Sequence, residues 1–163
     1  RPTSGKVYIN GTDIFAMNDD ELAIFRRRQV GIIYQFYNLI PILNVEENMA
    51  IPMELDGRKV EKAQMDDMLL RLGLTERRTH LPNELSGGQQ QRTSIGRALI
   101  TRPSIVLADE PTGNLDTKAS NEIMHLLKTS NRELNQTIIM ITHNMELAKA
   151  ADRTIMIEDG KIR

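Results

Sequence analysis

The chain has 163 residues, a length that suits one domain with an adequate hydrophobic core. Hydrophobic residues make up 40% and charged residues 26%, as in a soluble globular protein, and the net charge of -1 argues against a non-specific nucleic-acid binder, which is normally basic. The absence of cysteine excludes disulfide bonds and thiolate metal sites and fits a reducing compartment. The most apolar stretch, VGIIYQFYNLIPIL, is broken by glutamine, asparagine and proline and predicts no membrane span, so any work at a membrane requires a partner subunit.

In chain order, the first predicted elements are a strand at KVYIN and a short helix at DDELAIFRRR. Arg26 to Arg28 end this helix, where they suit the negative end of its dipole, and we interpret them as a solvated face rather than a phosphate site. Four short apolar runs predict strands, and they cover residues 30–34, 104–108, 137–142 and 153–158. None alternates strictly between polar and apolar residues, which is typical of a parallel sheet covered on both faces.

Helical periodicity lies between these strands. The segment VEKAQMDDMLLRLGL carries an apolar stripe that Gly73 ends as a C-cap, formed by Val60, Met68, Leu69 and Leu72. The segment DTKASNEIMHLLKTSNREL carries a second stripe, formed by Ala119, Ile123, Leu126 and Leu127. Because a strand, a helix and a strand in succession form a βαβ unit, the predicted fold class is α/β with a mostly parallel sheet.

The stretch LSGGQQQR, Leu85 to Arg92, places two glycines where a third helix is predicted to begin. Ser86 and Gln89 have the spacing of a capping box, so Gly87 and Gly88 fall in the first turn, where each costs roughly 1 kcal/mol relative to alanine. One explanation is that an anion, above all a phosphate, approaches the helix N-terminus closely. The same residues also fit a flexible loop that precedes a helix.

Polar residues directly follow three of the predicted strands. Gln35 follows the first, Asp109 and Glu110 follow the second, and His143 follows the third. In an open parallel sheet, ligands bind outside the carboxyl ends of the strands, so these residues are expected to gather at one edge. Asp109 suits Mg²⁺ beside phosphates, and Glu110 can polarise an attacking water. Taken singly, each residue also fits an ordinary solvated loop position.

Together these residues resemble the nucleotide-binding subunit of an ABC transporter. LSGGQ resembles the family's signature motif, and IVLADEP resembles its Walker B strand. GNLD, Gly113 to Asp116, is similar to the D-loop, Gln35 to the Q-loop glutamine and His143 to the switch histidine. Five motifs in the family's order make the resemblance specific, and it covers essentially the whole chain.

The resemblance implies a P-loop NTPase-like core with an inserted helical subdomain, and roles for the matching residues. Asp109 would hold Mg²⁺ through waters, Glu110 would be the catalytic carboxylate, and Gln35 and His143 would sense the metal and the γ-phosphate of ATP. The residues implied to contact nucleotide are Ser86, Gly87, Gly88, Gln89 and Asp116. Two subunits would stack head to tail around two ATP molecules, on the cytoplasmic face of the membrane, held there by a transmembrane permease subunit.

The sequences of three motifs resemble those of one branch of the family. QFYNLIPILNVEENM, LSGGQQQR and DEPTGNLD are similar to the branch of MacB-type macrolide exporters, lipoprotein-release complexes and antimicrobial-peptide export systems, whose ATPases pair with FtsX-like permeases. The apolar segment from Phe36 to Leu43 follows Gln35. It is interpreted either as core packing or as part of a permease-docking groove.

The family's phosphate loop, GxxxxGK[ST], is absent from these residues. Lys6 in TSGKV is not its lysine, because valine follows it and the stretch leads into a strand rather than a helix. We therefore expect one ABC ATPase domain, residues 1–163, truncated at both ends. We expect an active ATPase in the complete protein, and in these residues alone weak or no ATP binding, no ATPase activity and exposed apolar surface.

The resemblance also implies two lobes. Residues 1–35 and 94–163 would form the core lobe, and residues 36–93 the helical signature subdomain. The alternatives are a non-transport ABC ATPase of the translation or DNA-repair type, or an inactive structural fragment. The repair type inserts a long coiled coil between the Q-loop and the signature, but Gln35 and Ser86 are only 51 positions apart (86 − 35), with no sustained heptads.

Overall fold

The computed structural model describes residues 3–163, so residues 1 and 2 of the predicted core lobe lie outside the described range. Its centre is a parallel sheet of β3 (Val30–Ile33), β4 (Ile105–Asp109) and β5 (Thr137–Ile141), in the order β3-β4-β5. Ile33 aligns with Ala108, and Asp109 with Ile141. Three of the four predicted strands and the α/β fold class are thereby confirmed.

Six helices are described within residues 3–163. They are α1 (Asp19–Gln29), α2 (Val45–Glu54), α3 (Lys62–Arg71), α4 (Gly87–Leu99), α5 (Thr117–Leu134) and α6 (Met145–Ala148), with 3₁₀ turns at Thr75–Arg77 and Pro82–Glu84. The helices predicted at DDELAIFRRR, at the LSGGQQQR stretch, at the segment before Gly73 and at the segment from Asp116 to Leu134 are confirmed. Gly73 adopts φ of 64°, as a C-cap glycine does.

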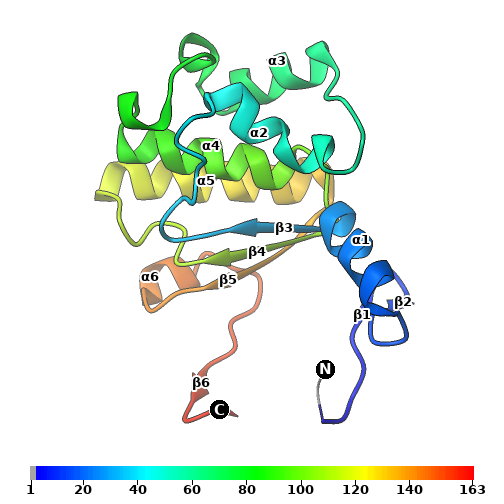
Figure 1. Cartoon of the computed structure of the whole chain (residues 1–163). Coiled ribbons are helices and arrows are strands. Elements are labelled where there is room, and N and C mark those ends of the chain that lie inside the picture. Colours follow the sequence, from blue (N-terminus) through cyan, green and yellow to red (C-terminus); the bar gives the residue numbers. More distant parts are fainter. Residues whose placement is uncertain (1–2) are drawn as a thin grey trace.

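The helices α4 and α5 lie on one face of the sheet, and α2 and α3 form the next layer above them (Figure 1). α4 packs against both α2 and β3, so it joins the outer layer to the sheet. The core is one continuous cluster that runs from the sheet through α4 to α2 and α3. Its fully buried members include Ile33, Val45, Met49, Leu72, Leu74, Ile95, Ile100, Val106 and Ile123.

The other face of the sheet is open within the described residues. Ile32, Leu107 and Ile139 stand side by side in register, and all three are exposed. The prediction of a sheet covered on both faces is therefore wrong for residues 3–163. The strands are apolar on both faces, but no described helix packs over the face that carries Ile32, Leu107 and Ile139.

The fourth predicted strand, residues 153–158, does not join the central sheet. Only β6 (Ile157–Glu158) forms there, and it pairs with β7 (Lys161–Ile162) in an exposed hairpin. The stretch DGKIR supplies the turn and the second strand of this hairpin. A similar two-stranded hairpin, β1 (Tyr8–Ile9) with β2 (Thr12–Asp13), precedes α1. Lys6 forms an ion pair with Asp13 of this hairpin.

The boundary predicted between residues 93 and 94 falls inside α4, a single helix. The division into a core lobe and a helical subdomain stays a prediction. Within residues 3–163, no helix has the combination of length and hydrophobicity that crossing a membrane requires.

Candidate functional site at the carboxyl edge of the sheet

The order of the three central strands brings the predicted polar residues to one edge. Gln35 lies two residues beyond the end of β3, Glu110 lies directly after β4, and His143 lies two residues beyond β5. Because β4 is the middle strand, Glu110 sits between the other two residues. The three residues therefore lie at the same edge of the sheet, as expected for the carboxyl ends of parallel strands.

Glu110 and the segment after β5 are joined directly. The backbone N–H and the ring Nδ1 of His143 both lie 2.7 Å from Glu110 Oε1, and the Thr142 hydroxyl donates to Oε2 at 3.2 Å. The Glu110 side chain is only 16% exposed, whereas the His143 side chain is 84% exposed. The carboxylate is therefore fixed from one side, while the imidazole beside it remains open to a ligand.

The surroundings of Glu110 also set its charge. Burial raises the pKa of its carboxyl, but the hydrogen bonds from the His143 backbone, the His143 ring and Thr142 outweigh burial, so the pKa lies below its ordinary value. Glu110 is consequently a carboxylate at neutral pH. A carboxylate can accept a hydrogen bond from a water, which is what orienting a nucleophile requires.

Asp109 projects differently from Glu110. It lies two residues beyond Leu107 on β4, so its side chain is on the open face of the sheet. It is exposed and forms no ion pair within the described part of the chain. No group of three or more His, Asp or Glu side chains gathers as a metal cage among residues 3–163. Asp109 thus offers a single carboxylate, which suits a cation that takes its other ligands elsewhere.

The loop 110–116 contacts the Gln35 segment. The Asn114 side chain donates to the backbone carbonyl of Gln35 at 3.0 Å. Gly113 lies so near that an added Cβ would stand 2.9 Å from Gln35 Nε2, so any larger residue would displace this amide. Asp116 ends the loop and caps α5, because its carboxylate accepts the backbone N–H of Ala119 at 2.8 Å. Its described contact is therefore structural.

The signature residues form the start of α4. Ser86 and Gln89 complete the predicted capping box, with bonds of 3.3 Å from Gln89 N to Ser86 Oγ and 2.9 Å from Ser86 N to Gln89 Oε1. No hydrogen bond within residues 3–163 joins Ser86–Gln89 to Glu110 or His143. The signature is thus not brought into contact with the Glu110 carboxylate of its own chain.

The two signature glycines have different neighbours. An added Cβ at Gly87 would lie 3.0 Å from the hydroxyl of Tyr37, whereas one at Gly88 would make only an ordinary 3.6 Å contact with Ala119. Part of the need for glycine at position 87 therefore comes from this chain's own tyrosine. Nothing within the described residues requires glycine at position 88.

Two residues on α4 that sequence reasoning missed also hold the site. Gln91 is fully buried and donates to the carbonyl of Pro111 at 2.7 Å, directly behind Glu110. Arg97 donates to the carbonyls of Tyr37 and Asn38, at 2.7 and 2.6 Å, and so fixes the loop after Gln35. The available signal was the helical spacing of Gln91 with Ile95 and Ala98, which puts an amide on an apolar stripe.

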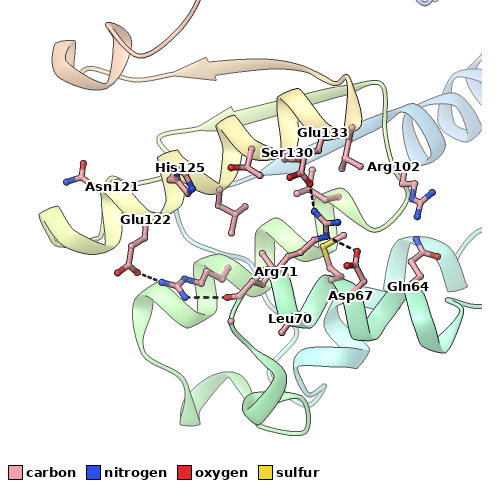
Figure 2. A pocket seen from close by; sticks show the side chains of 18 residues that line it. Gln64, Asp67, Leu70, Arg71, Arg102, Asn121, Glu122, His125, Ser130 and Glu133 are labelled. Atoms are coloured by element: carbon pink, nitrogen blue, oxygen red, sulfur yellow. Dashed lines mark hydrogen bonds and ion pairs between the residues drawn. The ribbon is translucent and has the colours of Figure 1, made fainter.

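A groove of about 980 Å³ lies away from this edge, between α3, α4 and α5 (Figure 2). Ion pairs from Arg71 to Glu133 and from Arg92 to Glu122 cross it (Figure 2). None of the predicted site residues lines this groove. The candidate site is therefore separate from this groove.

Comparisons with known proteins agree with these motifs. The ABC transporter family model matches residues 1–113. The ABC transporter ATP-binding protein YtrE of Bacillus subtilis (strain 168) is 46% identical over 164 residues, which cover 99% of this chain and 71% of YtrE. The lipoprotein-releasing system ATP-binding protein LolD of Cytophaga hutchinsonii is 44% identical over 164 residues, which cover 99% of this chain and 75% of LolD.

Solved structures lead to the same family. The dimeric, post-hydrolysis structure of the ATP-binding cassette MJ0796 bound to ADP and Pi superimposes with a TM-score of 0.85 at 39% identity, over 99% of this chain and 72% of MJ0796. A second dimeric MJ0796 structure gives a TM-score of 0.83 at 40% identity. The chain therefore belongs to the ABC transporter family and is an ATP-binding domain of that family, whose members hydrolyse ATP to power transport.

Proposed function

We propose that Glu110 is the catalytic carboxylate of this ATPase and that His143 and Gln35 stand on either side of the reacting γ-phosphate. The observation that carries the proposal is the bonding of Glu110 to His143 and Thr142 at the carboxyl edge of the sheet. These bonds fix the direction of the carboxylate and keep it charged. Since Oε2 accepts only one hydrogen bond in the described chain, at 3.2 Å, it can also accept one from a water.

Asp109 fits the role of the Mg²⁺ ligand, with Gln35 as the second candidate. The exposed carboxylate of Asp109 is a hard oxygen donor, and no cationic side chain among the described residues pairs with it. A magnesium ion bound there would take its remaining ligands from waters and phosphates. When bound, the ion neutralises charge on the phosphates. The residues of this chain orient the water, hold Glu110 ionised and keep Gln35 against the loop 110–116.

The signature residues act, in this proposal, on the ATP held by a second copy of the domain. Ser86, Gly87, Gly88 and Gln89 form a helix N-terminus, which favours an anion. They have no bond to Glu110 within this chain, and the similar MJ0796 structures are dimers. A head-to-tail pair would place the signature of one subunit, with Asp116 close to the shared interface, opposite the Glu110 edge of its partner.

The partner that uses this energy is proposed to be a transmembrane permease of the FtsX or MacB type. The supporting comparisons are the relatives named for lipoprotein release and the transporter protein YtrE. Phe36 and Ile42, 71% and 83% exposed, offer an apolar docking surface beside Gln35. The domain would then work at the cytoplasmic face of the membrane, in export or release of a lipoprotein, macrolide or antimicrobial peptide. Nothing in the comparisons favours a translation or DNA-repair ATPase.

The test is Glu110→Gln in the full-length subunit that carries this chain. Because the amide cannot polarise water but keeps the volume of the side chain, steady-state Mg-ATPase activity should fall by at least about 100-fold, a loss typical of removing general base assistance. ATP binding should persist, and an ATP-bound dimer should accumulate in gel filtration. An unchanged turnover rate in a correctly folded variant would contradict the role given to Glu110.

A further inference from the structure

Gln91 is a fully buried polar residue on α4, two positions after the last signature residue. Its Nε2 donates a 2.7 Å hydrogen bond to the carbonyl oxygen of Pro111. Its Oε1 is buried and has no hydrogen-bond partner within residues 3–163. The amide thus makes a single long-range bond and leaves its acceptor desolvated, an unfavourable arrangement that an apolar side chain of similar size would avoid.

The acceptor of this bond lies at a sensitive point of the backbone. Pro111 directly follows Glu110, whose φ of 43° is in the left-handed region that residues other than glycine rarely adopt. Such a conformation persists only where surrounding contacts hold it. Two backbone bonds contribute on this side, from Glu110 N to Ile141 O and from Gly113 N to Glu110 O, both 3.0 Å. Gln91 supplies a further contact to this turn, from α4.

We propose that Gln91 is a positioning residue that links the signature motif to the Glu110 carboxylate of the same chain. The inference rests on the proposed function, in which the signature contacts the ATP of the partner while Glu110 acts on the chain's own ATP. Ser86 to Gln91 belong to one continuous helix start, so a shift of the signature moves the Gln91 amide with it. The bond to Pro111 passes that shift to the turn that aims Glu110. Gln91 therefore couples the two ATP sites of a dimer.

The first test is Gln91→Met in the full-length subunit. Methionine keeps the volume and loses the Nε2 donor, so the turn at Glu110 is no longer held from α4. We expect kcat for Mg-ATP to fall about tenfold, as loss of one buried hydrogen bond to a reacting-site turn implies. The KM for ATP should stay within about twofold, because Gln91 itself touches no nucleotide in the proposal.

Ser94→Ala is the matched control. Ser94 is also fully buried on α4 and its hydroxyl also has no partner within residues 3–163, but it makes no bond to the loop 110–116. Removing that hydroxyl tests buried polarity on the same helix without touching Pro111. Its kcat should equal that of the wild type within about twofold.

Gln91→Glu provides a readout that packing alone would not change. A carboxylate at this position faces the Pro111 carbonyl without a proton, whereas a protonated carboxyl can donate to it. Burial raises the pKa of a carboxyl, so protonation becomes accessible in mildly acidic buffer. The kcat of this variant relative to the wild type should therefore rise at least about threefold between pH 8 and pH 6.

The outcomes separate this inference from the proposed function. An inactive wild-type subunit would overturn the proposed function itself. An active wild type together with a folded Gln91→Met variant of unchanged kcat would overturn the role of Gln91 alone. If thermal melting shows that Gln91→Met does not fold, the pH profile of Gln91→Glu decides, and a flat ratio to the wild type would count against the proposal.

Discussion

The backbone of Glu110 is left-handed, while its carboxylate accepts hydrogen bonds from Thr142 and His143. A residue other than glycine in such a conformation carries about 1–3 kcal/mol of strain. Hydrogen bonds to an ionised carboxylate are stronger than those between neutral groups and offset this strain. The charge of Glu110 therefore contributes to the stability of the fold as well as to the proposed chemistry.

This contribution predicts a pH dependence of stability. Because the pKa of Glu110 is lowered in the folded state, its carboxylate stabilises the fold above the ordinary glutamate pKa, and the effect is lost as the pH falls through the folded pKa. The difference in Tm between wild type and Glu110→Gln should be largest near pH 7 and should shrink toward pH 3. Glu146→Gln, at an exposed glutamate, is the control and should show a small difference. A Tm difference for Glu110→Gln that is independent of pH would contradict this reading.

Gly88→Ala is predicted to change stability and activity in opposite directions. Gly88→Ala creates no crowding within the chain and should raise the free energy of unfolding by up to about 1 kcal/mol through helix propensity. If the partner's phosphate requires the space, ATPase activity in the full-length subunit should nevertheless fall by at least about tenfold. Thermal melting and steady-state kinetics of the same preparation measure both effects.

Variants at Gly87 distinguish crowding by the chain's own Tyr37 from contact with a partner's phosphate. Gly87→Ala should have a lower Tm than Gly88→Ala, because its Cβ would press on the Tyr37 hydroxyl. Tyr37→Phe removes that hydroxyl, so the double variant should recover its Tm. If activity also recovered completely, crowding by Tyr37 would explain the glycine, and contact with a partner's phosphate would not be needed.

At the scale of elements, α4 is the helix on which the site depends. Its first turn carries the signature, Gln91 reaches the turn after Glu110, and Arg97 reaches the loop after Gln35. The same helix packs on both α2 and β3. A displacement of α4 would therefore move the signature, the turn after Glu110 and the loop after Gln35 together, although these are far apart in the sequence.

Arg97→Lys tests the hold of α4 on the loop after Gln35. Arg97 binds the carbonyls of Tyr37 and Asn38, both of which have positive φ, and a lysine cannot bond both in the same geometry. The free energy of unfolding should fall by about 1–3 kcal/mol, and amide exchange in residues 36–43 should accelerate. Arg26→Lys, which alters only a bond within exposed α1, should change neither measurement. Unaltered exchange in Arg97→Lys would mean that other contacts hold the loop.

At the scale of the whole molecule, the uncovered sheet face is the dominant feature. Ile139 and Ile141 of β5 are 49% and 64% exposed. Ile139 aligns with exposed Leu107, which in turn aligns with exposed Ile32. Contiguous apolar surface of this kind promotes association. The two layers formed by α2, α3, α4 and α5 lie on the opposite side of the sheet (Figure 1).

The 163-residue chain studied alone should consequently self-associate at micromolar concentration without ATP. Ile139→Lys combined with Ile141→Lys places two charges on this face and should shift the elution of the chain toward the monomer. Ile162→Lys, at a 76% exposed isoleucine in the terminal hairpin, is the control and should leave association unchanged. Light scattering coupled to gel filtration distinguishes these cases, and a wild-type monomer would contradict the prediction.

The amino-acid sequence by itself determined the three parallel strands, the helices α1, α3, α4 and α5, and the edge at which Gln35, Glu110 and His143 meet. These features follow from local information: apolar runs of strand length, helical stripes, the Ser86–Gln89 capping box and the rule that strand ends share an edge. The sequence did not indicate α2 or α6. The family motifs added the expected chemistry. Local sequence patterns could not predict the contacts between the motifs, because these contacts join residues far apart in the chain.

Only the tertiary structure decided how the motifs touch and which apolar runs are covered. It bound Glu110 to His143, set Gly87 against Tyr37 and placed Gln91 behind Pro111. It also left one sheet face open and kept residues 153–158 out of the central sheet. The physical reason is that an apolar run specifies what a strand can bury but not which neighbour is present to cover it. Burial and long-range hydrogen bonds depend on that neighbour.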